Sequence, residues 1–301
     1  MSKKITRRMM FKQAMAASAA ATAGPVLLAG MPAMPSIIGR AHAAQNDDLN
    51  QAALKGVAYF KQRNEKQIEM VDALRKAIAS GDLQAAQRAY VDSRPPYEEI
   101  ETLAGNFEDS DTDIDARPYS FDGGETSDDF RGFHKIEYLL FRDDDLDMAG
   151  KYADKLAKSA QKLHKELGEP ERYSPQTHFE GMIGLAEEIG SKKISSEEET
   201  WSDQSMLIFR SNIIGINSQY EPFAVLVAKK APDRDQAVKD AYKSFRAVLE
   251  PYETGPGEAL TPYSKVRIGE RKAISDATYK LRDSLIAAAE TLGVTEQGNG
   301  D

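Results

Sequence analysis

A histidine and a glutamate three residues apart could together bind a metal ion. In the segment Gly132-Phe133-His134-Lys135-Ile136-Glu137, this spacing places both functional side chains on one face of a helix. On the helix that we expect over residues 129–142, Glu137 falls within the apolar stripe and His134 lies at its edge. A buried carboxylate needs a metal cation, an Arg or Lys side chain, or a proton, since burying it uncompensated costs several kcal/mol. The spacing leaves all three solutions open.

A second pair of potential ligands follows the break at Pro95-Pro96. A new helix is expected to begin here, and Glu98 and Glu101 share one of its faces at the same three-residue spacing. Two helices that each contribute two ligands can build an iron site inside a bundle, although the usual Glu-x-x-His order is reversed in this chain. Alternatively, acidic residues in a first turn only complement the helix dipole and stay solvated.

The first 43 residues have the composition of an export signal. They contain six basic residues and no acidic residue, and an apolar, alanine-rich stretch runs from Ala14 to about Ile38. Thr6-Arg7-Arg8-Met9-Met10-Phe11-Lys12 is typical of a twin-arginine signal, and Ala41-His42-Ala43 is typical of a cleavage site. Glycine and proline interrupt the apolar stretch, so we expect cleavage and release into the periplasm rather than a membrane anchor.

The composition of the mature chain favours a cation as the species that the protein binds. Without residues 1–43, 33 Lys and Arg residues face 48 Asp and Glu residues, a formal charge of −15. This acidity makes nucleic acids and anionic lipids poor partners and cations good ones. The chain contains no cysteine, so a metal site must use carboxylate, imidazole or hydroxyl ligands.

Helical periodicity covers most of the mature chain and predicts an all-α fold built from up-and-down bundles. The longest irregular stretches are expected at 107–128 and 251–262. A connector near 167–177 is expected to separate an N-terminal helical bundle over 44–170, which carries the metal site, from a C-terminal bundle over 171–301. Helices are expected near 83–93, 96–106, 129–142, 147–167, 178–190, 196–230 and 233–250, and Gly81 and Gly293 stand where two further helices end.

The histidine motif resembles the G-x-H-x-x-E signature of the imelysin-like family, in particular its EfeO/EfeM-type periplasmic components of bacterial iron uptake. Further landmarks in family order are Arg94-Pro95-Pro96-Tyr97-Glu98-Glu99-Ile100-Glu101, Asp113-Ile114-Asp115-Ala116-Arg117, Ala186-Glu187-Glu188, Lys192 through Glu199, and Tyr263-Ser264-Lys265. The resemblance implies two four-helix bundles in tandem and a metal site whose ligands are His134, Glu137, Glu98, Glu101 and Asp115. No cupredoxin module precedes the motif, as in the short EfeM type.

The same resemblance implies a function in iron acquisition. The expected cargo is Fe²⁺ or Fe³⁺, with Zn²⁺, Mn²⁺ or Cu²⁺ as other possible occupants, and the expected partners are an inner-membrane iron permease and a periplasmic haem peroxidase. Two alternatives stay open: a metallopeptidase, because the family carries a peptidase label, and a cation-dependent binder of acidic polysaccharide. The residues favour binding over catalysis, since no His-Glu-x-x-His motif occurs in the chain.

Overall fold

The computed structural model describes residues 37–195, 198–253 and 259–294. Within these ranges all regular secondary structure is helical and no strand occurs, which confirms the predicted all-α fold. Residues 1–36 of the predicted signal peptide lie outside the described residues, and its last residues, 37–43, belong to the first described helix. Among the described helices, none combines the length and apolar character needed to cross a bilayer.

The first four-helix bundle is built around one long helix. This helix, α2 (Ile37–Ala79), packs along α7 (Leu146–Glu166) and α3 (Leu83–Ser93), and the short α6 (Phe133–Phe141) closes the bundle against α3 and α7. As predicted, α2 ends near Gly81, whose φ of +77° is the left-handed conformation that glycine adopts without strain. Asp82 then caps α3 by accepting a hydrogen bond from the Ala85 amide.

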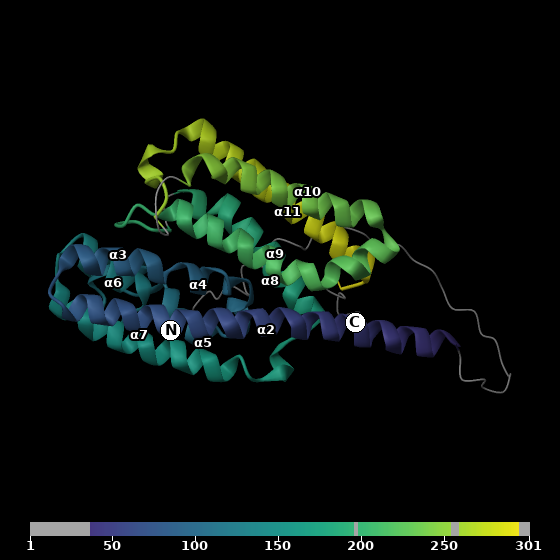
Figure 1. Ribbon diagram of the computed structural model, residues 1–301, viewed down its shortest axis with the longest axis horizontal. Coiled ribbons are helices and arrows are strands. Elements are labelled where there is room, and N and C mark those ends of the chain that lie inside the picture. Colours follow the sequence, from purple (N-terminus) through teal and green to yellow (C-terminus); the bar gives the residue numbers. More distant parts are fainter. Residues whose placement is uncertain (1–36, 196–197, 254–258, 295–301) are drawn as a thin grey trace.

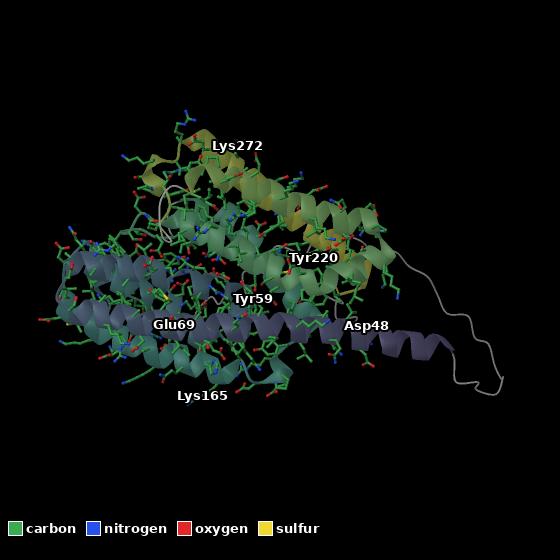
Figure 2. The ribbon with its side chains drawn as sticks, in the orientation of Figure 1. Asp48, Tyr59, Glu69, Lys165, Tyr220 and Lys272 are labelled. Atoms are coloured by element: carbon green, nitrogen blue, oxygen red, sulfur yellow. The ribbon has the colours of Figure 1, made fainter. Side chains whose placement is uncertain are left out.

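The second bundle contains the four remaining long helices. They are α8 (Pro175–Ser191), α9 (Ser205–Lys230), α10 (Pro232–Leu249) and α11 (Ile268–Leu292). In Figure 1 the helices α9, α10 and α11 of this bundle, coloured green to yellow, form a layer beside the blue and teal first bundle. The layers meet where α9 runs along α2, and the hydroxyl of Tyr59, labelled at that junction in Figure 2, donates to Glu99.

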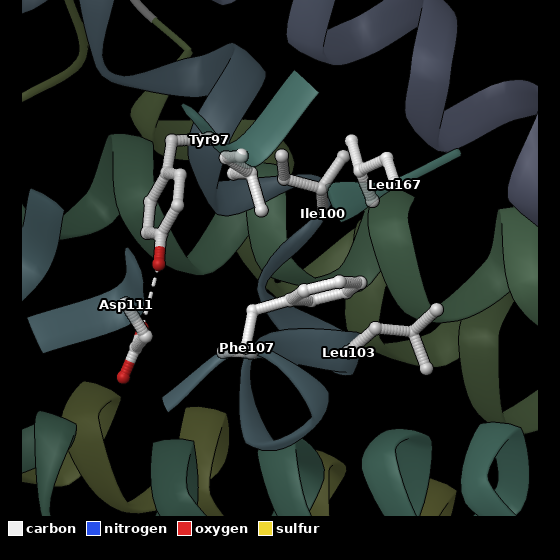
Figure 3. A pocket seen from close by; sticks show the side chains of 8 residues that line it. Tyr97, Ile100, Leu103, Phe107, Asp111 and Leu167 are labelled. Carbon is white, nitrogen blue, oxygen red and sulfur yellow. Dashed lines mark hydrogen bonds between the residues drawn. The ribbon is translucent and has the colours of Figure 1, made fainter. Parts of the chain in front are cut away.

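Three short elements, which follow α3 in the chain, lie between the two bundles near the centre of the molecule and together form what we call the connecting segment. They are α4 (Pro95–Glu98), the 3₁₀ helix η1 (Glu101–Asn106) and α5 (Glu108–Asp115). The α4 helix contacts α2 and α9, η1 contacts α8, and α5 contacts α7. Figure 3 shows one link between them, in which the Tyr97 hydroxyl donates to Asp111 at 2.6 Å. The apolar pocket beside this bond measures about 10 Å³, room for about one water molecule, so it is not a ligand site.

Three predicted segments differ from the structure. The predicted helix 96–106 is divided into α4 and η1, because the backbone around Glu99 and Thr102 is pressed against α9 and α8. The predicted irregular stretch 107–128 contains α5, whose acidic first turn complements the helix dipole and whose Ile114 is fully buried. The helix predicted over 196–230 begins only at Ser205, because the backbone amides of Trp201 and Ser202 donate hydrogen bonds to the Glu137 carboxylate.

Two glycines make the close approach of these segments possible. A β-carbon on Gly215 of α9 would lie 2.2 Å from the carbonyl oxygen of Glu99, and one on Gly181 of α8 would lie 1.8 Å from that of Thr102. Both distances are far below van der Waals contact. The connecting segment is therefore fixed between the bundles by backbone contacts that no other residue type permits.

We expect Gly215→Ala to destabilise the protein by about 1–3 kcal/mol, the usual range for overpacking a close contact. Urea unfolding measures the change. Gly150→Ala in the second turn of α7 is the matched control, because its β-carbon would lie an ordinary 3.6 Å from the side chain of Ile78. Alanine stabilises a helix interior by about 0.5–1 kcal/mol relative to glycine, so the control should be neutral or stabilised. Equal losses of stability in both variants would contradict the packing argument.

Candidate metal centre

The five sequence-predicted ligands all lie in one buried region between the connecting segment and α6. Glu98 ends α4, Glu101 begins η1 and Asp115 ends α5, whereas His134 and Glu137 lie on the first two turns of α6. Each of these side chains is at most a few per cent exposed. The structure therefore brings all five into one region, but four of them are divided between two groups with different neighbours, and Glu101 lies outside both groups.

The first group contains His134, Glu137 and Glu199. One ligand atom from each lies within 4.8 Å of the others, and His134 Nδ1 is 3.2 Å from Glu137 Oε2. The other oxygen of Glu137, Oε1, accepts hydrogen bonds at 2.8 Å from the backbone amides of Trp201 and Ser202. Because these amides donate to the carboxylate and not to helical backbone carbonyls, α9 begins later in the chain than predicted.

The second group contains Glu98, Asp115 and Glu198, whose ligand atoms also lie within 4.8 Å of one another. His134 links the groups, because its Nε2 is 3.5 Å from Asp115 Oδ1 while its Nδ1 faces Glu137. Glu101 belongs to neither triad. Its Oε2 accepts from Lys193 Nζ at 2.7 Å and from Asn212 Nδ2 at 2.9 Å.

Three buried cations each pair with two or three of these carboxylates. Arg94 reaches Glu98 at 2.6 Å, Glu199 at 2.7 Å and Asp115 at 2.8 Å, and its guanidinium lies over the Phe133 ring. The other two cations are bound in the same manner: Arg117 contacts Glu198 and Asp115, and Lys193 contacts Glu101, Glu198 and Glu98.

The charges of this buried cluster do not balance. Six carboxylates face three cations, a formal charge of −3 if every group is ionised, and none of these side chains is more than a few per cent exposed. An uncompensated buried charge is costly, so protons or bound cations must supply the missing positive charge. The carboxylates are Glu98, Glu101, Asp115, Glu137, Glu198 and Glu199, and the cations are Arg94, Arg117 and Lys193.

Burial sets the protonation of the key groups. It raises the pKa of Glu137 well above its usual value, and the nearby Glu199 carboxylate raises it further. Burial also raises the pKa of Glu98 well above normal, despite the opposing effect of Arg94. For Glu198 burial acts in the same direction, but Arg117 and Lys193 outweigh it and the pKa is lowered. Without a metal ion, protons are therefore expected on some carboxylates.

The imidazole of His134 is kept neutral. Burial lowers its pKa well below the usual value, and the charges of Arg117 and Arg94 lower it further. When Nδ1 carries the proton and donates to Glu137, the lone pair of Nε2 is available, and Nε2 has no hydrogen-bond partner in the described part of the chain. A neutral imidazole with an available lone pair is the form that binds a metal ion.

Glu198 and Glu199 are the site residues that sequence reasoning missed as ligands. Their run of acids lies within the landmark segment from Lys192 to Glu199, but it was expected only to begin the helix predicted over 196–230. One alternative for the buried Glu137 carboxylate was an ion pair with an Arg or Lys side chain. Such ion pairs occur instead at Glu98, which contacts Arg94, and at Glu101, which contacts Lys193. Among the described residues, no Lys or Arg side chain pairs with Glu137.

Comparison with known proteins finds the same family over most of the chain. The family model described as imelysin, which carries a peptidase label, matches residues 28–289. The chain is 28% identical over 236 residues to the iron uptake system component EfeM of Pseudomonas syringae pv. syringae, covering 78% of this chain and 82% of that protein. It is 30% identical over 257 residues to the iron uptake system component EfeO of Escherichia coli O1:K1, covering 84% and 68%.

A solved structure has the same fold. It is a putative iron-regulated protein A precursor from Parabacteroides distasonis, which superposes with a TM-score of 0.66 at 16% identity. The match covers 82% of this chain and 95% of that chain.

Proposed function

The chain belongs to the imelysin family, and on that premise we propose that it is a metal-binding component of iron uptake that carries its cargo ion in the buried cluster around His134 and Glu137. The homologues support a role in iron uptake, since those named above are iron uptake components. We further propose that the twin-arginine signal delivers the protein to the periplasm, where it passes iron to an inner-membrane permease and works with a haem peroxidase of the same system.

The observation that supports metal binding is the excess of buried carboxylate around one neutral imidazole. A purely structural network would be expected to match its charges, whereas this cluster falls short by three positive charges if all groups are ionised. A ring nitrogen of His134 and one carboxylate oxygen each of Glu137 and Glu199 lie within 4.8 Å of one another, close enough for one ion to draw them together. Carboxylate and imidazole donors suit iron and manganese, although they discriminate poorly among divalent metals.

A peptidase function is the competing proposal, because the matching family model carries that label. The named homologues are iron uptake components rather than enzymes. The site also lacks the paired histidines of helical zinc peptidases, which lie four residues apart with a glutamate between them. We therefore assign binding and delivery as the function.

Metal analysis of the mature protein purified from its source bacterium tests the proposal. We expect iron in the preparation, and anomalous scattering should locate the ion between His134 and Glu199. Deleting the gene should impair growth only when iron is scarce. If no metal copurifies and none binds on titration, the metal site is wrong; if metal binds but growth under iron limitation is unchanged, the uptake role is wrong.

Metal binding should release protons and weaken in acid. Burial raises the pKa of Glu98, Glu137 and Glu199, so these groups hold protons that an incoming cation must displace. A raised pKa favours the protonated form as pH falls, and the affinity should fall with it. Calorimetric titration in two buffers of different ionisation enthalpy measures the protons released. Equal apparent heats in both buffers, with affinity independent of pH, would contradict the expectation.

A further inference from the structure

A cleft of about 460 Å³ lies between the two bundles, outside the buried cluster. Its walls come from α2 and α4 on one side and from α9 and α10 on the other. The volume is within the range of about 300–1,000 Å³ that is typical of small-molecule sites, which often occur between domains. The charged residues that line it are Arg63, Glu99, Arg210, Arg246 and Glu253.

The cleft is positively charged in a strongly acidic protein. Three arginines and two glutamates line it, a formal charge of +1, whereas the whole chain carries −9. The arginines come from three different helices: Arg63 from α2, Arg210 from α9 and Arg246 from α10. Three guanidinium groups that approach one cavity from separate directions suit a ligand with more than one anionic group.

Two internal carboxylates already show how such a ligand would be held. Glu99 accepts from Arg63 at 2.8 Å, and Glu253 pairs with Arg246 at 3.0 Å. The second pair is accessible, since the side chains of Arg246 and Glu253 are 33% and 28% exposed. Ion pairs in contact with solvent contribute at most about 1 kcal/mol, so a ligand carboxylate can displace Glu253 from Arg246 at little cost.

The cleft and the buried cluster lie on opposite sides of α4. Arg94 and Glu98 point into the cluster, whereas Pro95 and Glu99, one position further along the chain, line the cleft. On α9, Ser211 lines the cleft and the adjacent Asn212 donates to Glu98 and Glu101. A ligand in the cleft would therefore touch both bundles without entering the cluster.

We propose that this cleft is a binding site for a small polycarboxylate, such as a di- or tricarboxylate, with Arg63, Arg210 and Arg246 as the recognition groups. Each guanidinium presents a planar pair of donors that matches a carboxylate. Tyr242 adds a neutral phenol, because burial raises its pKa and keeps its hydroxyl protonated. The site does not depend on the proposed metal function, and its binding is measured on the metal-free protein.

Calorimetric titration of the metal-free mature chain with citrate, and separately with inorganic phosphate, tests the proposal. Citrate should bind, and phosphate should bind far more weakly because it engages fewer arginines. The double variant R210Q/R246Q should lose about 10- to 100-fold in citrate affinity, the effect of losing hydrogen bonds to charged groups. The control R75Q/R234Q removes the same charge from α2 and α10 at half-exposed ion pairs outside the cleft and should stay near wild type.

A gain of affinity provides a test that misfolding cannot imitate. Glu253→Gln removes the carboxylate that competes for Arg246, so citrate should bind more tightly to this variant than to the wild type. The proposal is overturned if wild-type protein binds no citrate, if phosphate binds as tightly, if the control double variant loses as much affinity as the cleft variant, or if Glu253→Gln leaves the affinity unchanged or lower.

Discussion

Replacing His134 and Glu137 with glutamine is expected to reduce metal affinity by more than about 100-fold, since losing even an indirect partner of a metal ligand costs about 10- to 100-fold. The double variant H134Q/E137Q removes the imidazole and one negative charge but preserves side-chain volume in a fully buried site. The glutamine at position 137 can still accept hydrogen bonds from the amides of Trp201 and Ser202. The helical fold should therefore survive, as circular dichroism would verify.

Fluorescence offers a direct readout of this loss. Trp201 is the single tryptophan of the chain, its backbone amide donates to Glu137, and its ring packs edge-on against Tyr138. Metal binding at Glu137 should change the emission of this residue, and the change should disappear in H134Q/E137Q. Competition with a chelator then gives the affinity for ferrous, ferric, manganese and zinc ions.

A control variant with the same chemical changes outside the site makes the result specific. H178Q/D235N also converts one buried histidine and one buried carboxylate, which lie in the second bundle and contact Ser174 and Tyr220 respectively. It should bind metal like the wild type. Wild-type affinity of H134Q/E137Q for every ion, or an equal loss in H178Q/D235N, would show that the ion binds elsewhere or that the assay reports only stability.

Local sequence signals were sufficient to predict most of the helices. The range predicted for 83–93 agrees with α3, and the helix ends near Gly81 and Gly293 are present, because capping and periodicity are local properties. The errors occur where tertiary contacts override these signals. The helix predicted over 96–106 is divided where backbone carbonyls press against Gly215 and Gly181, and no local pattern reveals a contact between residues so far apart in the chain.

The site was predictable only in part, for a related reason. Spacing on one helix identifies His134 with Glu137 and Glu98 with Glu101, and the structure places these pairs in one buried region. It also places Glu199 with the first pair and Glu198 with Glu98, from a segment more than 60 residues later in the chain. Helical periodicity could not reveal these carboxylates, because the segment that carries them is not helical: its amides at 201 and 202 bond to Glu137.

The buried cations contact different carboxylates of this cluster. Arg94 separates the two carboxylate triads by contacting Glu98 and Asp115 on one side and Glu199 on the other. Lys193 satisfies Glu101 and Glu198, and its pKa is raised because the carboxylates outweigh the effect of burial. The first triad, around Glu137, has the least compensation from fixed charges, which is why it is the better position for an added cation.

Lys193→Met is expected to destabilise the metal-free protein by about 3–5 kcal/mol, the usual effect of removing one partner from a buried ion pair. The methionine side chain fills a similar volume, but Glu101 and Glu198 lose an ammonium group that lies 2.7 Å and 2.9 Å from them. Since protons can replace the lost charge, the deficit should shrink as pH falls. A bound metal ion should also stabilise the variant more than it stabilises the wild type.

Urea unfolding of metal-free protein measures the effect, and two further variants identify its cause. K193M/E101Q removes one of the stranded carboxylates and should recover a large part of the lost stability, which a simple packing defect would not allow. Lys239→Met is the matched control, because this half-exposed lysine pairs with Asp235 at 2.6 Å and should contribute at most about 1 kcal/mol. If Lys193→Met behaved like this control, or if Glu101→Gln brought no recovery, Lys193 would not be the counter-ion that holds the carboxylates of the buried cluster together.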